Sequence, residues 1–137
     1  MSISVIKDIQ ELYNLNHNIF TGNESYHIET IKHFVDKQSG YIIQKDNISI
    51  GYILYGILDG KFMILSFGIL KEYRNQGYGK LLLKHFLSFH QSRSIYLHVR
   101  SFNFIAKNLY ESLGFRDKKL EHNFYGNEDG VLMELII

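Results

Sequence analysis

The 137-residue sequence contains no cysteine, so disulfides, thiolate zinc sites and a cysteine nucleophile are all excluded. Proline is absent too, which we attribute to base composition in a chain so rich in isoleucine, lysine and asparagine. Long apolar runs are missing as well. Residues 1–10 lack the apolar core of a signal peptide, and no run is long enough to cross a bilayer. We therefore expect a cytoplasmic protein with no membrane partner.

Net charge and metal-binding motifs are also scarce. The formal net charge is only +1, which gives no bulk attraction for nucleic acid or for an anionic membrane. The seven histidines include no pair with the His-x-x-x-His spacing of a helical metal site, and no cysteine can join them. We expect no nucleic-acid partner and no bound metal.

Apolar and aromatic residues are plentiful. Hydrophobic residues make up 45% of the chain, and it holds ten tyrosines and ten phenylalanines. A chain of this length can bury a sizeable core, and no linker, repeat or low-complexity segment divides it. The sequence therefore predicts a single domain over residues 1–137.

Hydrophobic periodicity and turn residues predict the order of helices and strands. In chain order we expect a strand at 3–6, helices at 8–19 and 27–36, strands at 41–44, 48–58 and 62–70, a helix at 80–90, a strand at 95–99, a helix at 103–113, and strands at 115–125 and 130–136. Asp46-Asn47 and Asp59-Gly60 are turn sequences, and the second favours a type I′ hairpin. The order β-α-α-β-β-β-α-β-α-β-β, around a mostly antiparallel sheet, predicts an α+β fold of a mixed, three-layer kind.

A polar loop joins the apolar strand 62–70 to the amphipathic helix 80–90. Residues 73–82 read Tyr-Arg-Asn-Gln-Gly-Tyr-Gly-Lys-Leu-Leu. Gly77 and Gly79 permit backbone conformations closed to other residues and let a ligand approach the main chain. The exposed N–H groups at a helix start lie at the positive end of its dipole and favour phosphates. A glycine pair before a helix is as often an ordinary tight turn, so both interpretations stay open for this loop alone.

The loop has the spacing Arg-x-x-Gly-x-Gly, at Arg74, Gly77 and Gly79. This spacing resembles the acyl-CoA loop of the GNAT superfamily of N-acetyltransferases. The dinucleotide fingerprint and the nucleoside triphosphate loop, which also bind phosphates, are both absent from the chain.

The second half of the chain strengthens this resemblance. Residues 97–100 read Leu-His-Val-Arg, Asn103 follows, and residues 109–115 read Leu-Tyr-Glu-Ser-Leu-Gly-Phe, which is similar to the strand, Asn and helix of the family. The ending at 123–135 resembles the branch that acetylates protein N-termini, including the bacterial ribosomal-protein alanine acetyltransferases. The motif match covers residues 67–115, and the N-terminal half agrees in pattern only.

The resemblance implies a set of contacts to acetyl-CoA. The strand before the loop would pair its backbone with the pantetheine arm, and the loop N–H groups would hold the pyrophosphate. An Asn at the next helix start would also contact the cofactor, although it serves equally well as a plain N-cap. The implied cofactor-binding residues are Phe67, Gly68, Ile69, Arg74, Asn75, Gln76, Gly77, Tyr78, Gly79, Lys80 and Asn103.

The resemblance also suggests catalytic residues, with one departure from the family. His98 stands where N-terminal acetyltransferases commonly carry a Glu, and an imidazole, whose ordinary pKa is about 6.5, can take a proton directly or through water. Tyr110 matches the family Tyr that donates a proton or hydrogen bond to the departing CoA sulfur. Both residues also have a structural interpretation: His98 would be a hydrogen-bonded residue of the strand, and Tyr110 would only pack in the core. Tyr125 could line an acceptor groove, although core packing would explain it as well.

The predicted activity is acetyl transfer from acetyl-CoA to a primary amine by direct attack in a ternary complex. The favoured acceptor is the α-amine of a protein or peptide N-terminus. Two alternatives stay open: a small-molecule amine such as a polyamine, amino acid or antibiotic, and a non-catalytic acyl-CoA-binding module. Acceptor specificity is expected in the variable segment 16–26. Because GNAT domains are often monomers or dimers, we expect a monomer or homodimer.

Overall fold

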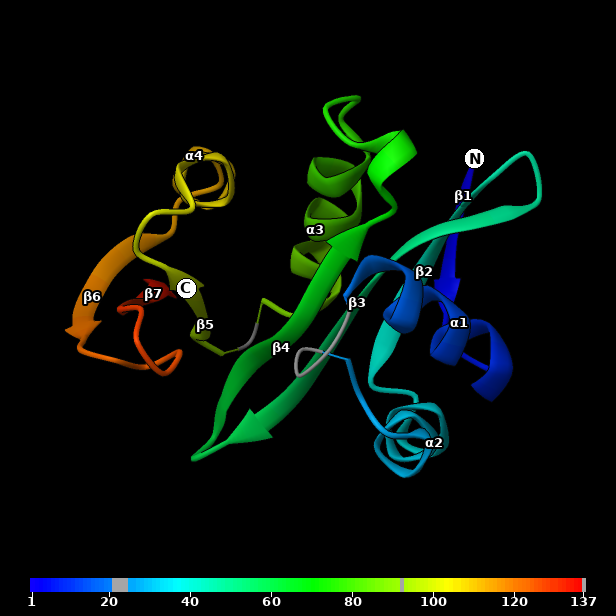
Figure 1. Ribbon diagram of the computed structural model, residues 1–137, viewed down its shortest axis with the longest axis horizontal. Helices are drawn as coiled ribbons and strands as arrows, with labels where there is room; N and C mark the ends of the chain where they lie inside the picture. Colours follow the sequence, from blue (N-terminus) through cyan, green and yellow to red (C-terminus); the bar gives the residue numbers. More distant parts are fainter. Residues whose placement is uncertain (21–24, 92, 137) are drawn as a thin grey trace. The chain divides into compact units, whose positions relative to one another are not determined.

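The computed structural model describes residues 1–20, 25–91 and 93–136 of the chain (Figure 1). The described helices and strands follow the predicted order, and a short 3-10 helix that was not predicted precedes α3. They are β1 (Ser2–Val5), α1 (Ile9–Ile19), α2 (Ile28–Lys37), β2 (Gly40–Lys45), β3 (Ile48–Leu58), β4 (Lys61–Ile69), η2 (Lys71–Tyr73), α3 (Tyr78–Phe89), β5 (Ile95–Arg100), α4 (Phe104–Ser112), β6 (Arg116–Glu121) and β7 (Gly130–Leu135).

Hydrogen bonding joins the strands in the order β1-β2-β3-β4-β5-β7-β6. The β4–β5 pair is parallel, whereas the pairs β1–β2, β2–β3, β5–β7 and β6–β7 are antiparallel, which confirms the mostly antiparallel sheet. Contacts divide the chain into two compact units. The first comprises Met1–Tyr55 and Ser66–Phe89, and the second comprises Gly56–Leu65 and His90–Ile137, so β3 and β4 each contribute to both.

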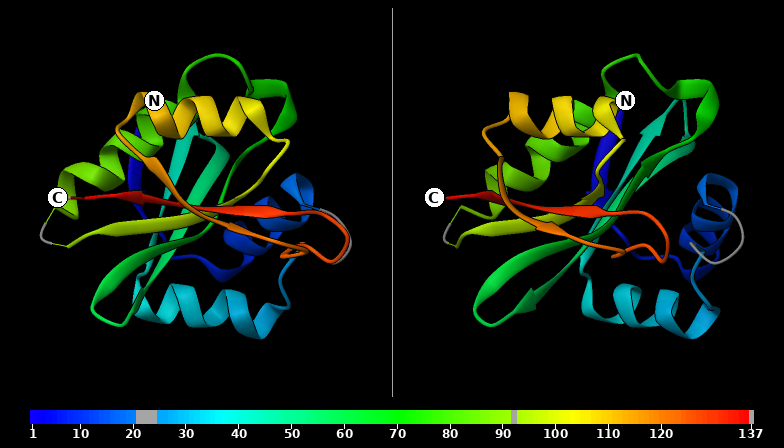
Figure 2. Two further views of the ribbon diagram at one scale, coloured as in Figure 1. Left: turned by 90° about the vertical axis from the view of Figure 1, so that its left-hand side faces the viewer. Right: turned by 60° about the vertical axis from the view of Figure 1, so that its left-hand side comes forward.

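The first unit has helices on both faces of its strands, which follows from the alternation of side chains along a strand. Buried residues of α1 and α2 form one core with Ile42, Tyr52 and Leu54. On the opposite face, the Tyr41 ring meets His85 of α3 edge to face, and Tyr55 contacts Phe86 of α3. Figure 2 shows α3 on the other side of β2 and β3 from α1 and α2.

The second unit places α4 on one side of β5, β7 and β6 (Figure 2). Along β5, Ile95, Leu97 and Val99 are buried, while His98 and Arg100 alternate with them and are half-buried. His98 and Arg100 therefore share one face of the strand.

Most predicted boundaries lie within one residue of the observed ones, and two need correction. The helix expected at 80–90 begins at Tyr78, so Gly79 lies in its first turn rather than in the loop. The strand expected at 115–125 ends at Glu121. Beyond it the chain turns, because Asp129 Oδ1 accepts the N–H of Asn123 at 2.9 Å and Asn123 has a φ of 55°.

The two predicted turns have the backbone that their sequences favour. Asp46 and Asn47 have φ values of 52° and 65°, and Asp59 and Gly60 have values of 52° and 76°. Positive φ at both central residues is the mark of a type I′ turn, so that prediction is confirmed at Asp59-Gly60. Among the described residues, no helix has both the length and the apolarity needed to span a membrane.

Candidate active site

The loop between β4 and α3 lies in the first unit. Two of its residues have a left-handed backbone conformation: Asn75, with a φ of 62°, and Gly77, with a φ of 87°. A Cβ atom added at Gly77 would meet nothing within 4 Å. Glycine is therefore favoured here by the backbone conformation and not by lack of space.

The start of α3 presents unused hydrogen-bond donors. The first helical bond runs from Leu81 N–H to Gly77 O at 3.1 Å, and in the described part of the chain the N–H groups of residues 76–80 donate to no backbone or side-chain acceptor. A helix leaves its first N–H groups unpaired, and its dipole makes this end positive. Lys80 adds a cation to the same turn. The loop thus has the donors and charge that a diphosphate requires, and it fits the predicted CoA contact.

Arg74 has a structural contact that the sequence did not indicate. Its Nε donates to the carbonyl oxygen of Ile69 at 2.9 Å, which fastens the loop to the end of β4. Gln76 adds a second clamp, because its Nε2 donates to the carbonyl oxygen of Glu72 at 3.1 Å. These two bonds hold the loop in the shape that exposes its N–H groups.

Gly68, in the strand predicted to pair with pantetheine, is explained by close packing. A Cβ atom there would lie 2.6 Å from Ile19 Cγ2 and 3.2 Å from the Phe20 ring. A Cβ on Gly51 of β3 would in turn lie 2.7 Å from the Gly68 carbonyl oxygen. The end of α1 thus lies directly against Gly68 of β4. Phe67 is half-buried and Ile69 is buried on either side of it.

A buried polar network anchors Asn16 and Tyr26, the two ends of the segment 16–26, and sequence reasoning did not find it. Asn16 is fully buried, donates to the Tyr52 hydroxyl at 2.8 Å and accepts the N–H of Tyr26 at 2.6 Å. The Tyr52 hydroxyl also bonds to Ser66 Oγ at 2.7 Å. Burial raises the pKa of Tyr52 to about 12, against the opposing effect of its bonds to Ser66 and Asn16. Burial raises the pKa of Tyr26 as well.

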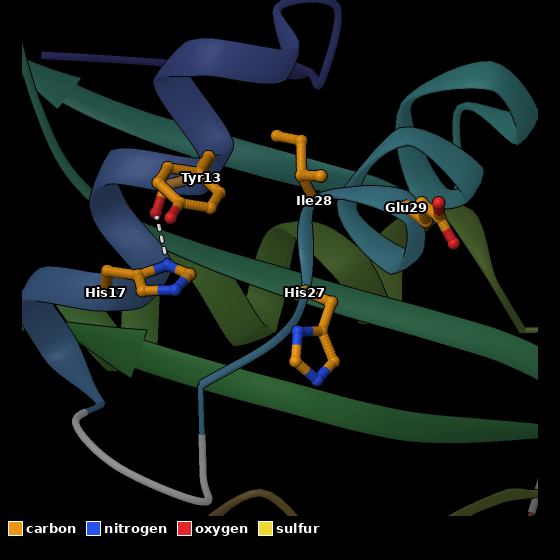
Figure 3. A pocket seen from close by; sticks show the side chains of 5 residues that line it. All are labelled: Tyr13, His17, His27, Ile28 and Glu29. Atoms are coloured by element: carbon orange, nitrogen blue, oxygen red, sulfur yellow. Dashed lines mark hydrogen bonds between the residues drawn. The ribbon is translucent and has the colours of Figure 1, made fainter.

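Residues 21–24 of the expected specificity segment lie outside the described residues. Beside this segment is a cavity of about 380 Å³, lined by Tyr13, His17, His27, Ile28 and Glu29 (Figure 3). The His17 ring stacks on Tyr13 with centroids 4.0 Å apart, and its Nδ1 lies 3.0 Å from the Tyr13 carbonyl oxygen. None of the predicted site residues lines this cavity. Among the described residues, no group of three or more His, Cys, Asp or Glu side chains could hold a metal ion.

His98, in the second unit, is held by two contacts. Its Nε2 lies 3.2 Å from Glu121 Oε2, and both side chains keep about a quarter of their surface exposed, at 23% and 24%. The ring of Phe124 stacks on the imidazole with centroids 4.1 Å apart and planes inclined by 12°. The imidazole is therefore both oriented and accessible. Glu121 was absent from the residues predicted for this site.

Tyr110 is buried on α4, where its ring meets Phe115 with centroids 5.9 Å apart. Burial raises the pKa of the Tyr110 hydroxyl well above its ordinary value, and the nearby Tyr125 raises it further. Its backbone carbonyl accepts the N–H groups of Leu113 and Phe115, which ends the helix. The hydroxyl is thus held in its neutral, proton-donating form.

Asn103 and Tyr125 also occupy defined positions in the second unit. The side-chain oxygen of Asn103 accepts the N–H of Ala106 at 3.2 Å, so Asn103 does act as the N-cap of α4. The Tyr125 ring lies beneath the Arg100 guanidinium at 4.4 Å, and Arg100 also pairs with Glu128 at 2.9 Å. Arg100 thereby ties the β6–β7 loop to β5.

The first unit thus has a donor-rich loop at a helix start, and the second has an accessible histidine. The chain belongs to the acetyltransferase (GNAT) family, whose model matches residues 6–115. This confirms the resemblance drawn from the sequence. Acetyl-CoA is the acetyl donor of this family, so the predicted class and cofactor agree with it.

Individual relatives agree with this assignment. An uncharacterized N-acetyltransferase of Methanocaldococcus jannaschii is 35% identical over 98 residues, which cover 68% of this chain and 63% of the relative. The ribosomal protein bS18-alanine N-acetyltransferase of Escherichia coli is 38% identical over 73 residues, which cover 48% of this chain and 49% of the relative. The chain thus aligns with 63% of the length of the first protein and about half (49%) of the second.

The fold is shared with a solved structure. The crystal structure of the Escherichia coli ribosomal-protein-S18-alanine N-acetyltransferase superposes with a TM-score of 0.85, at 23% identity, over 99% of this chain and 93% of that one. This likeness confirms the predicted fold class.

Proposed function

We propose that this chain transfers the acetyl group of acetyl-CoA to the α-amine of a protein or peptide N-terminus. The observation that carries the proposal is the loop before α3, whose N–H groups at 76–80 are unused in the described protein. Relatives named as N-acetyltransferases, one of them acting on the alanine of a ribosomal protein, support the choice of acceptor.

The donor would be held by the first unit. The N–H groups of residues 76–80 and the positive end of α3 would bind the pyrophosphate, while Arg74 and Gln76 keep the loop in shape through their bonds to Ile69 and Glu72. The β4 backbone around Gly68 would face the pantetheine arm. Bound acetyl-CoA supplies the reactive thioester.

The acceptor amine must lose a proton to react. With a pKa of about 8, roughly 10% of an α-amine is neutral at pH 7, against roughly 0.04% of a lysine side chain with a pKa of about 10.4. An N-terminal amine therefore needs only a modest base. As the amine nitrogen bonds to the carbonyl carbon and the C–S bond breaks, His98 would take one proton from the nitrogen.

Tyr110 would assist the departing sulfur as a hydrogen-bond donor. Full proton transfer from an ordinary phenol to a thiolate is uphill by about 2 kcal/mol, because their pKa values differ by about 1.5. Burial raises the pKa of Tyr110 further, so transfer of its proton is less favourable still. The hydroxyl then stabilises the thiolate without becoming ionised, and the thiolate takes its proton from water.

The test is thiol release from acetyl-CoA with three acceptors at equal concentration: a peptide beginning with alanine, the same peptide with a blocked α-amine and a free lysine, and the polyamine spermidine. We expect turnover with the first only. Turnover with spermidine alone would assign the activity to small amines. Acetyl-CoA binding by calorimetry without turnover of any acceptor would leave a non-catalytic binding module.

A further inference from the structure

We propose that Glu121 is a positioning residue: it holds the His98 imidazole with Nε2 protonated, so that Nδ1 is the atom that receives the proton of the acceptor amine. This inference rests on the proposed role of His98 as the base. It adds a residue that neither the motifs nor the family match marks, since Glu121 lies beyond the matched region, which ends at residue 115.

The strand register brings the two side chains together. In the antiparallel ladder, His98 of β5 pairs with Leu132 of β7, and Glu121 of β6 pairs with Gly130 of β7. Glu121 therefore lies two pairs further along, on the same face as His98, and its side chain crosses β7 to reach His98 Nε2 at 3.2 Å. Two residues from strands that do not pair with each other thus meet on one face of the sheet.

The hydrogen bond selects one tautomer of His98. An ionised carboxylate can only accept, so the hydrogen between Nε2 and Glu121 must belong to the imidazole. A neutral ring with hydrogen on Nε2 has its lone pair on Nδ1. Within the part of the chain that the structure describes, Nδ1 has no protein partner, and the side chain is 23% exposed. Nδ1 is thus available to an amine or to a bridging water.

A glycine in β7 makes room for the second contact of His98. A Cβ atom at Gly130 would lie 3.0 Å from Phe124 Cβ and 3.1 Å from Tyr125 Cε2. Because Gly130 has no side chain, both aromatic residues can lie over β7, and Phe124 can stack on the imidazole. The stacking fixes the plane of the imidazole, and the bond to Glu121 directs Nε2 toward the carboxylate and Nδ1 away from it.

The proton balance is simple. The N–H bond of the amine breaks, and the proton forms a bond with the lone pair of His98 Nδ1. The imidazole becomes an imidazolium, whose charge is partnered by the Glu121 carboxylate at 3.2 Å. Release of the proton to water restores the neutral ring with hydrogen still on Nε2.

The first measurement is nitrogen NMR of the His98 ring in the resting protein, with Glu121→Ala, Glu121→Gln and a matched surface control, Glu111→Gln. We expect Nε2 protonated and Nδ1 unprotonated in the wild type and in the control. The hydrogen-bonded Nε2 proton signal should be lost in Glu121→Ala while the melting temperature stays near that of the wild type. A wild-type ring protonated on Nδ1 would overturn the proposal.

The second measurement is steady-state kinetics with the alanine-starting peptide. Glu121→Ala should lower kcat by about 10-fold, part of the 10²-fold or more that a positioned base contributes, and leave the KM for acetyl-CoA unchanged. Glu121→Gln should retain part of the activity, since its amide oxygen can still accept from Nε2. The double variant with His98→Ala should be no slower than His98→Ala alone, because Glu121 acts only through His98.

The outcomes separate this inference from the proposed function. If the wild type turns over no acceptor, the proposed function fails and the catalytic role of the pair fails with it, while the NMR result still decides whether Glu121 sets the tautomer. If His98→Ala stays active and Glu121→Ala does not, Glu121 is itself the proton acceptor and the positioning role is wrong. Rates that multiply in the double variant would also refute it.

Discussion

Gly77→Ala and Gly60→Ala form a matched pair that tests the donor loop. Both glycines have positive φ, 87° and 76°, and a Cβ atom added at either would meet nothing within 4 Å. Alanine at either position therefore carries the same penalty, the strain of a left-handed backbone, which is about 1–2 kcal/mol. Gly60 lies at the tip of the β3–β4 hairpin, and only Gly77 lies in the proposed pyrophosphate loop.

The two variants should express this penalty differently. Gly60→Ala should lower the free energy of unfolding by about 1–2 kcal/mol and leave acetyl-CoA binding unchanged. In Gly77→Ala the exposed loop can relax to escape the strain, so it should lose less stability. The bound loop must recover the strained shape, which would weaken acetyl-CoA binding by roughly 5–30-fold, the equivalent of about 1–2 kcal/mol.

Urea unfolding and calorimetric titration with acetyl-CoA measure both quantities on the same samples. Gly77→Ala would contradict the proposed pyrophosphate site if it binds acetyl-CoA as tightly as the wild type while losing as much stability as Gly60→Ala. That result would make Arg74 to Gly77 an ordinary turn. A loss of binding in both variants would instead show that the loss is not specific to the loop.

Three further predictions concern buried polar groups and the leaving group. Tyr110→Phe should lower kcat by about 10- to 100-fold in the thiol-release assay, and a loss below threefold would show that Tyr110 merely packs. Because the folded pKa of Tyr52 is raised to about 12, its neutral form stabilises the fold fully below pH 10, and this contribution is lost as the pH rises from 10 to 12. In urea unfolding, the free energy of unfolding should fall by up to about 2–3 kcal/mol over this pH range, and by less in Tyr52→Phe. Equal falls in the two proteins would contradict the raised pKa of Tyr52. Asn16→Ala should reduce the free energy of unfolding by about 1–3 kcal/mol, since it leaves the Tyr26 N–H without its acceptor; an unchanged urea midpoint would show that water replaces the amide.

Local chemistry explains why so much of the fold could be predicted from the sequence. Asp8 caps α1 through its side chain, and Asp59-Gly60 has the backbone of a type I′ turn. Few residue types can cap a helix or adopt positive φ, so both features can be recognised from the residues alone. The helix after the loop was placed two residues late, because Tyr78 and Gly79 resemble loop residues although they already form its first turn. Local patterns locate elements well and their ends less well.

The burial of Asn16 could have been predicted from the sequence, but not its partner. Leu12, Leu15 and Ile19 mark the buried face of α1, and Asn16 lies on the same face at helical spacing. A polar residue there must find a partner when it is buried. Its partner Tyr52 lies 36 residues further along the chain, and no local pattern identifies so distant a contact.

Glu121 shows why the site itself could not be completed from the sequence. Strict alternation along β6 from Arg116 would place Glu121 on the face of Asp117, which pairs with the fully buried Met133 and so faces away from His98. The ladder instead shifts its register between Asp117 and Lys119, and this irregularity inserts one extra residue into β6. An extra residue exchanges the faces of everything after it, which turns Glu121 to the side of His98. The pairing of a carboxylate with the candidate base therefore depends on a single bulge, and the acid-base chemistry of this site can be inferred only once the strand register is known.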